Sequence, residues 1–311
     1  MTDWVTETEP PGSVYLAALN TVTSLNGPVV DVEQMFTDLD LCQGAFRALR
    51  EDERAKLEGK IRLCLRAFFL GIHSQNLPAS LYATFANRLE AGDALVTFNY
   101  DVALENELIH AQRFRVRNGY GRSFEADWDE PSSDVTVLKL HGSINWIGVL
   151  FGGARGGHIG TFNSSLGPRP FVDNVDSLFP DYPKRVLDNT FPGGGVIDGA
   201  TTLVLPSYEK KFFVKTSVDD EWIPFYESLW SQAAEFLEKS ERIVIIGYSI
   251  PAADHDARAL LFSMSNKRAE IVVSCASSNE SLGQQFRDHG FARVHQFGGF
   301  KDWLAQPAVA H

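Results

Sequence analysis

The chain is poor in cysteine. Only three occur among its 311 residues, Cys42, Cys64 and Cys275, and they stand far apart. No two have the C-x-x-C spacing of a structural zinc site, and three scattered residues make no disulfide framework. We therefore predict a protein of the reducing cytoplasm that binds no zinc or other metal.

Positive charge and long apolar runs are also scarce. The 28 Lys and Arg residues are outnumbered by 40 Asp and Glu, which gives a formal net charge of -12. Nucleic acids and anionic membrane surfaces attract clustered positive charge, so we expect neither as a partner. No apolar run approaches the roughly 20 residues that a spanning helix needs. The acidic start, MTDWVTETEPPG, has no signal-peptide pattern.

Hydrophobic residues, in contrast, are plentiful at 44%, which is enough to form a sizeable core. Residues 31–90 carry apolar residues at helical spacing, and we expect 1–92 to be a helical N-terminal region of the same domain. One such stripe consists of Leu57, Ile61, Cys64, Leu65 and Phe68.

From residue 93 onward, short apolar runs alternate with helical patterns. DALVTFNYD precedes the helical VALENELIHAQ, and RIVIIGYSIP precedes ADHDARALLFSM. EIVVSC and RVHQF are two further runs of this kind. Continuous Val, Ile and Leu strands between helices are typical of a parallel sheet. We predict an α/β fold over 93–311, with a Rossmann-like parallel sheet covered by helices on both faces.

One stretch breaks this alternation. Residues 147–200 are rich in Gly, Pro, Asn and aromatic residues, as in FGGARGGHIGTF and NTFPGGGV. We expect an irregular, glycine-rich insertion or small subdomain, because long connections of this kind in compact proteins are commonly functional.

The polar residues that follow the predicted strands are the candidate site. Ligands of open parallel sheets bind outside the carboxyl ends of the strands, where these residues would converge. Some of these residues also have a purely structural interpretation. Asn99 and Asp101 also fit the N-cap and a first-turn acid of the helix that follows. Gly247 and Ser249 also fit a simple turn. The candidates are Thr97, Asn99, Asp101, His141, Gly142, Gly247, Ser249 and Ser274.

Several motifs, in order, resemble a known family. TFNYD, LKLHGS, LVLPSYEKKF and IIGYSIP are similar to the NAD-binding core of the sirtuins. The resemblance is to their divergent bacterial branch of NAD-hydrolysing domains, which often act in phage defence. It covers residues 93–304, although the specific motifs are only a small part of that range.

The resemblance implies a role for each matching residue. Asn99 would contact the nicotinamide ribose or orient water, and Asp101 would lie near the carboxamide. His141 would be the general base, which a histidine pKa near 6.5 permits at neutral pH. Gly247 and Ser249 would form the turn that holds the ribose and phosphates of NAD.

The remaining candidates would assist binding. Gly142 has no side chain, which lets the backbone approach a ligand closely. Thr97 and Ser274 are assigned to cofactor binding because each ends a predicted strand. NAD would be the substrate or ligand.

Two features depart from the family pattern. The zinc-binding cysteines of deacetylating sirtuins are absent, which disfavours a protein deacylase. The family also has a first strand and a Gly-Ala-Gly turn that holds the pyrophosphate. Before Asp93 no G-x-G occurs in this sequence. We therefore expect the first strand and phosphate loop to be absent, either because the chain begins late or because its lineage has lost them, and we expect weak or absent NAD binding.

Three functions follow from these patterns. The first is an NAD hydrolase that releases nicotinamide and ADP-ribose, with His141 and Asn99 as catalytic residues. The second is an inactive module that senses NAD or ADP-ribose, or binds a partner, as a homo-oligomer or with a separate sensor protein. The third is an NAD-dependent protein deacylase.

Overall fold

The protein is a mixed α/β chain. A computed structural model describes it in several stretches, which include all the elements discussed below. They are residues 38, 39, 41, 43–51, 53, 54, 57, 80–116, 118–121, 133–143, 146–150, 157–161, 196–198, 203, 219–250, 254–275 and 280–306.

The first parallel unit follows the pattern seen in the sequence. Helix α5 (Ser80–Ala86) precedes β1 (Ala94–Thr97), and α6 (Ala103–His110) connects β1 to β2 (Thr136–Lys139). The two strands are parallel, with Leu95 opposite Val137. The sequence predictions of a strand before Phe98 and a helix after Asp101 are confirmed.

The second parallel unit alternates in the same way. Strands β6 (Arg242–Ile246), β7 (Glu270–Ser274) and β8 (Val294–Phe297) form a three-stranded parallel sheet. Helices α10 (His255–Phe262), α11 (Glu280–Asp288) and α12 (Phe300–Leu304) follow these strands in turn. The three strands and helix α10 were expected from the sequence, whereas α11 was not predicted.

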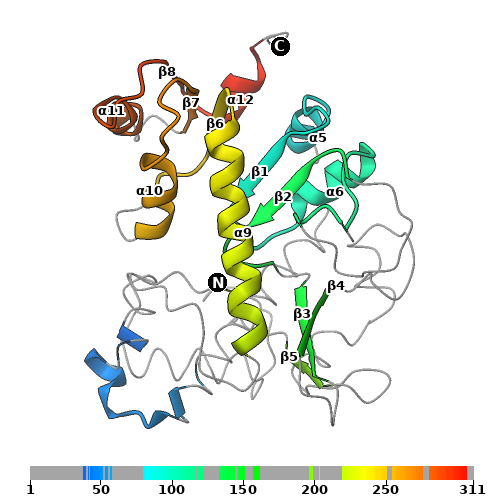
Figure 1. Ribbon diagram of the computed structural model, residues 1–311, viewed down its shortest axis with the longest axis vertical. Coiled ribbons are helices and arrows are strands. Elements are labelled where there is room, and N and C mark those ends of the chain that lie inside the picture. The colour runs from blue at the N-terminus through cyan, green and yellow to red at the C-terminus, as the bar shows by residue number, and fades with distance from the viewer. Residues whose placement is uncertain are drawn as a thin grey trace.

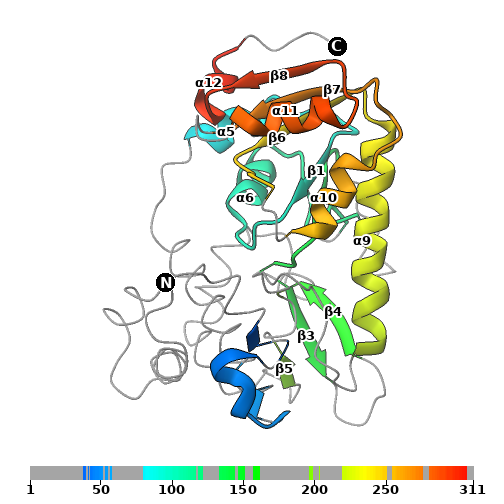
Figure 2. The same cartoon turned by 90° about the vertical axis from the view of Figure 1, so that its left-hand side faces the viewer.

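The glycine-rich region is more regular than the sequence indicated. Its described residues form β3 (Trp146–Leu150), β4 (Gly157–Thr161) and β5 (Val196–Asp198), an antiparallel sheet in the order β4-β3-β5. Glycine inside a strand weakens it, so a glycine-rich composition favours loops and did not reveal these strands. Figure 2 shows this sheet below the parallel strands, beside the lower half of α9.

Helix α9 (Asp219–Lys239) joins the two hydrophobic cores. Its Leu229 lies in a core with β2, α5 and α6, whereas its Leu237 lies in a second core with β6, β7, α10 and α11. In Figure 1, α9 runs between β1 and β2 on its right and α10 and α11 on its left. The burial of one side of this helix therefore stabilises both halves of the fold.

The N- and C-terminal parts of the described chain also meet. Phe85 of α5 packs edge-on against Phe300 and Trp303 of α12, with ring centroids 5.6 and 5.9 Å apart. Arg88 donates to the backbone oxygens of Leu304 and Gln306. Helices α5 and α12 accordingly lie side by side at the top of Figures 1 and 2.

The N-terminal region is described only in part. A 3-10 helix, η1 (Gly44–Ala48), and α5 are helical as expected, and Leu57 is buried. The rest of the stripe that was predicted up to Phe68 lies outside the described residues.

One difference concerns the sheet itself. The sequence predicted one parallel sheet, but the described strands form two, β1-β2 and β6-β7-β8. No described strand lies between β1 and β6, so the hydrogen bonding of the sheet is interrupted there.

Candidate functional site

The carboxyl ends of β1 and β6 meet through an aromatic pair. Phe98 follows β1 directly, and Tyr248 comes two residues after β6. Their rings stack with centroids 4.5 Å apart and planes 19° from parallel. The two strand ends that were expected to converge from distant parts of the sequence are therefore in contact.

His141 lies beside this aromatic pair. It follows β2, is 6% exposed, and packs edge-on against Phe98 with ring centroids 5.0 Å apart. Its Nε2 lies 3.8 Å from Oδ2 of Asp254. Because Asp254 is itself only 6% exposed, the two groups interact where water screens them little.

Asp254 is positioned from two directions. Its carboxylate accepts a hydrogen bond from the Tyr248 hydroxyl and another from the backbone amide of Ala257, 3.3 Å away, as the N-cap of α10. Asp254 thus couples His141 to Tyr248 and to the start of α10. A carboxylate that faces one ring nitrogen favours a proton there and leaves the other nitrogen as an acceptor.

Three of the sequence candidates line one cavity. Thr97, Asn99 and Gly247 border a space of about 470 Å³ between β1 and β6, together with Phe98 and Tyr248. Asn99 is exposed, and its backbone amide donates to the Thr97 hydroxyl at 3.1 Å. His141 does not border this cavity, but it contacts Phe98, which does.

The other candidates have different surroundings. The Asp101 carboxylate accepts from the amide of Ala103 at 3.1 Å, just ahead of α6, whose N-cap is Val102. Gly142 has a φ of +84° and pairs with Leu203. Ser249 is exposed, and Ser274 is fully buried at the end of β7. None of these four borders the cavity.

Gly247 adopts a backbone conformation that favours glycine. Its φ is +64°, and a Cβ there would meet no atom within 4 Å. Its amide donates to the Ser274 backbone oxygen at 2.9 Å. Because that amide is already hydrogen-bonded, it is not available to a ligand in this conformation. Gly247 therefore leaves room for a ligand but does not donate a hydrogen bond to it.

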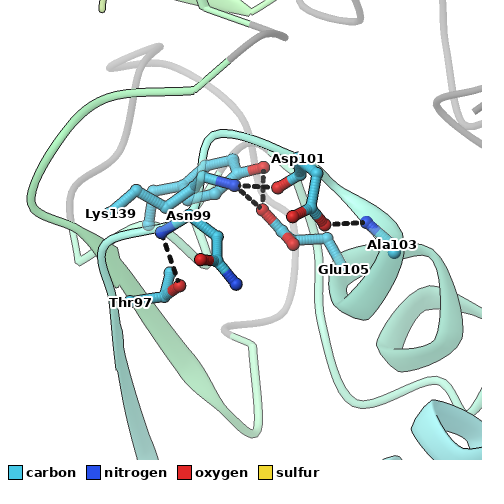
Figure 3. A network of polar contacts seen from close by, with 7 residues as sticks. Thr97, Asn99, Asp101, Ala103, Glu105 and Lys139 are labelled. Atoms are coloured by element: carbon cyan, nitrogen blue, oxygen red, sulfur yellow. Dashed lines mark hydrogen bonds and ion pairs between the residues drawn. The ribbon is translucent and has the colours of Figure 1, made fainter. Parts of the chain in front are cut away.

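A buried ion pair supports the loop after β1. Lys139 and Glu105 have side chains that are 0% and 4% exposed, and Nζ lies 2.7 Å from Oε1. Lys139 also donates to the backbone oxygen of Asp101. Figure 3 shows Lys139 reaching both groups, while the Asn99 side chain stays outside this network. Burial raises the pKa of Glu105, and Lys139 partly opposes that rise.

Sequence reasoning missed several of these residues. Lys139 sits inside an apolar strand, where a charge predicts a buried partner, but the sequence does not say that Glu105 is the partner. Asp254 was not among the candidates, because it stands in the helical stretch ADHDARALLFSM and not directly after a predicted strand. Nothing in the sequence marked Phe98 and Tyr248 as site residues, apart from their positions after two predicted strands.

A further feature of the turn after β6 is its strain. Ile250 is buried and has a φ of +49°, which is unusual for a β-branched residue and costs about 1–3 kcal/mol. Its backbone oxygen accepts from Arg258 of α10 at 3.4 Å. Strained backbone of this kind persists where surrounding contacts fix it, and such positions cluster at functional sites.

Two further observations concern metals and membranes. Among the described residues, no group of three or more His, Cys, Asp and Glu could hold a metal ion. Within the same part of the chain, no helix has both the length and the apolar character to cross a membrane.

Comparisons with known proteins add no identification. No protein-family model matches the chain, and no curated protein matches it.

Proposed function

We propose that the chain is a sirtuin-like NAD hydrolase domain, which cleaves NAD to nicotinamide and ADP-ribose. The observation that supports this proposal best is the His141–Asp254 pair beside the cavity that Asn99 and Gly247 line. Asn99, His141 and Gly247 follow three different strands, as the residues of ligand sites in parallel sheets do. The two parallel sheets would then be parts of one Rossmann-like sheet.

The proposed reaction replaces the bond between nicotinamide and ribose by a bond to water. Nicotinamide leaves as a neutral molecule, so no strong acid is needed, and the ribose passes through an oxocarbenium-like state. His141 would take the proton from the attacking water, and Asp254 would stabilise the imidazolium that forms. Asn99 would orient the water or the ribose, because its amide both donates and accepts.

The test is incubation of the purified chain with NAD, with nicotinamide followed by chromatography. We expect release to fall by about 10²- to 10⁴-fold in His141→Ala, as is usual for loss of a general base. His110→Ala is the matched control, because the His110 side chain is 62% exposed on α6. Undiminished release from His141→Ala, or no release from any form of the chain, would contradict the proposal.

A second candidate is a module that binds NAD or ADP-ribose without cleaving it. The observation in its favour is the bonded amide of Gly247, together with the absence of a G-x-G turn before Asp93. Calorimetric titration with both nucleotides distinguishes the two functions. Tight binding without release of nicotinamide supports the module, whereas rapid release excludes it.

A further inference from the structure

Four side chains form a closed ring of contacts beside the cavity. His141 packs edge-on against Phe98, and Phe98 stacks on Tyr248. The Tyr248 hydroxyl donates to Oδ2 of Asp254, and that same oxygen lies 3.8 Å from Nε2 of His141. We call these four residues the contact ring. Its members follow β1, β2 and β6 and begin α10, so the ring connects four elements.

Only the two aromatic members of the contact ring reach the cavity. Phe98 and Tyr248 line it, whereas His141 and Asp254 do not. The latter two are each 6% exposed, while Tyr248 is half-buried. Tyr248 is therefore the residue that joins the wall of the cavity to the buried His141–Asp254 pair through a hydrogen bond.

The two oxygens of the Asp254 carboxylate have different partners. Oδ1 accepts from the amide of Ala257, at the start of α10. Oδ2 accepts from the Tyr248 hydroxyl and faces His141. A bond at one oxygen leaves the plane of a carboxylate able to turn, whereas bonds at both oxygens fix it. The hydroxyl of Tyr248 therefore helps to determine where the charged oxygen of Asp254 points.

The position of Tyr248 is itself well fixed. Its ring stacks on Phe98, and its backbone oxygen accepts from the thiol of Cys275 at 3.4 Å. On either side of it, Gly247 and Ile250 have φ angles of +64° and +49°, which set the path of the turn after β6. The hydroxyl is thus held in place before any ligand binds, as a supporting group of a reactive site must be.

The geometry explains why the orientation of Asp254 matters to His141. A separation of 3.8 Å is too long for a hydrogen bond, so the two groups interact through charge. Both are buried, and charge interactions between buried groups are screened little by water. A hydroxyl that donates to a carboxylate forms a strong, charge-assisted bond, which keeps the negative charge at the oxygen facing the histidine.

We propose that Tyr248 is a positioning residue for the His141–Asp254 pair. Its hydroxyl orients Asp254 toward His141, and its ring, stacked on Phe98, forms a wall for the ligand. The effect on turnover rests on the proposed NAD hydrolase function, whereas the orientation of Asp254 does not. The hydroxyl then acts on kcat through Asp254, and the ring acts on KM.

The first test compares two tyrosine variants in the assay of nicotinamide release. Tyr248→Phe removes the hydroxyl and keeps the ring, so we expect kcat to fall about tenfold with KM unchanged. Tyr226→Phe is the matched control, because Tyr226 is a buried tyrosine of α9 that does not border the cavity. We expect its kcat to stay within about twofold. An unchanged kcat in Tyr248→Phe overturns the proposal.

Tyr248→Leu tests the ring and serves as a second variant. It removes the hydroxyl and the stacking contact with Phe98 together. We expect the same fall in kcat as in Tyr248→Phe and, in addition, a KM that rises by about three- to tenfold. A KM equal to that of Tyr248→Phe would contradict the role of the ring as a wall. Circular dichroism and thermal unfolding show that each variant is folded.

A double-mutant cycle shows whether the hydroxyl acts through Asp254. In the Asp254→Asn background the charge that the hydroxyl orients is gone, so Tyr248→Phe should lower kcat by no more than about twofold further. If instead the two losses multiply, Tyr248 acts independently of Asp254, which overturns the proposal. A general loss of stability would not produce this dependence on one carboxylate.

The last measurement needs no turnover. Nitrogen-15 NMR of histidine-labelled protein reports which ring nitrogen of His141 carries the proton, and His141→Ala identifies its signal. A carboxylate facing Nε2 favours a proton there, so we expect the fraction protonated at Nε2 to fall in Tyr248→Phe and Asp254→Asn but not in Tyr226→Phe.

This measurement separates the two proposals. If no form of the chain releases nicotinamide but the His141 proton moves as expected, NAD hydrolysis is wrong and the positioning role of Tyr248 stands. If Tyr248→Phe leaves the His141 proton where it is in the wild type, the positioning role is wrong, whatever the turnover.

Discussion

Lys139 of β2 and Glu105 of α6 form an ion pair of 2.7 Å that is almost completely closed to water. The Tyr120 hydroxyl donates to the same Glu105 oxygen at 3.4 Å. Lys139 also bonds the backbone oxygen of Asp101, so one side chain holds both the loop after β1 and the helix that follows it. The loop that carries Asn99 therefore depends on a charge inside the core.

We expect substitution of Lys139 to be strongly destabilising. Lys139→Met leaves the Glu105 carboxylate without its charged partner in the core, at a cost of about 3–5 kcal/mol in the free energy of unfolding. Lys139→Met combined with Glu105→Leu should recover much of that loss, because no charge then stays buried. Chemical denaturation of the two variants measures this, and an equal or greater loss in the double variant would contradict it.

The pH dependence of stability provides a second test. Burial raises the pKa of Glu105 above its ordinary value of 4.5, so the folded chain holds this proton more tightly than the unfolded chain. The stabilisation linked to this proton is complete below pH 4.5 and is lost as the pH rises through the folded pKa. Between pH 4.5 and neutrality, unfolding free energy should fall more steeply in the wild type than in Glu105→Gln. Equal slopes would contradict this prediction.

Asp254→Asn tests the role of this carboxylate in positioning His141. Asparagine still caps α10, so we expect the fold to be kept. Without the carboxylate the imidazolium that forms during turnover loses its stabilising partner, so nicotinamide release should fall, but by less than in His141→Ala. Asp256→Asn is the control, since Asp256 is exposed in the same helix. Release that is unchanged in Asp254→Asn would contradict this role.

Gly247→Ala separates backbone strain from ligand contact. Alanine at φ +64° costs about 1–2 kcal/mol, although no atom would obstruct its Cβ. Gly290→Ala is a matched control, with a φ of +91° and equally open space between α11 and β8. We expect similar losses of stability, measured by thermal unfolding, but weaker NAD binding only in Gly247→Ala. Equal NAD binding by both variants would remove Gly247 from the site.

Local sequence patterns determined much of the secondary structure. The apolar runs before Phe98, His141, Gly247 and Cys275 are strands because continuous Val, Ile and Leu residues suit a sheet buried on both faces. The same patterns indicated which polar residues stand at strand ends. The assigned roles of those residues, and the 1–92 and 93–311 organisation, stay predictions.

Tertiary structure alone decided which of those residues meet. Pairing between strands depends on contacts across many residues, so no local pattern could show that Asp254 faces His141 or that Glu105 neutralises Lys139. The gap between β1 and β6 is likewise visible only when strand order is known. The sequence alone determined the strands and their polar ends, and the fold decided their neighbours, because pairing and burial are long-range properties of the chain.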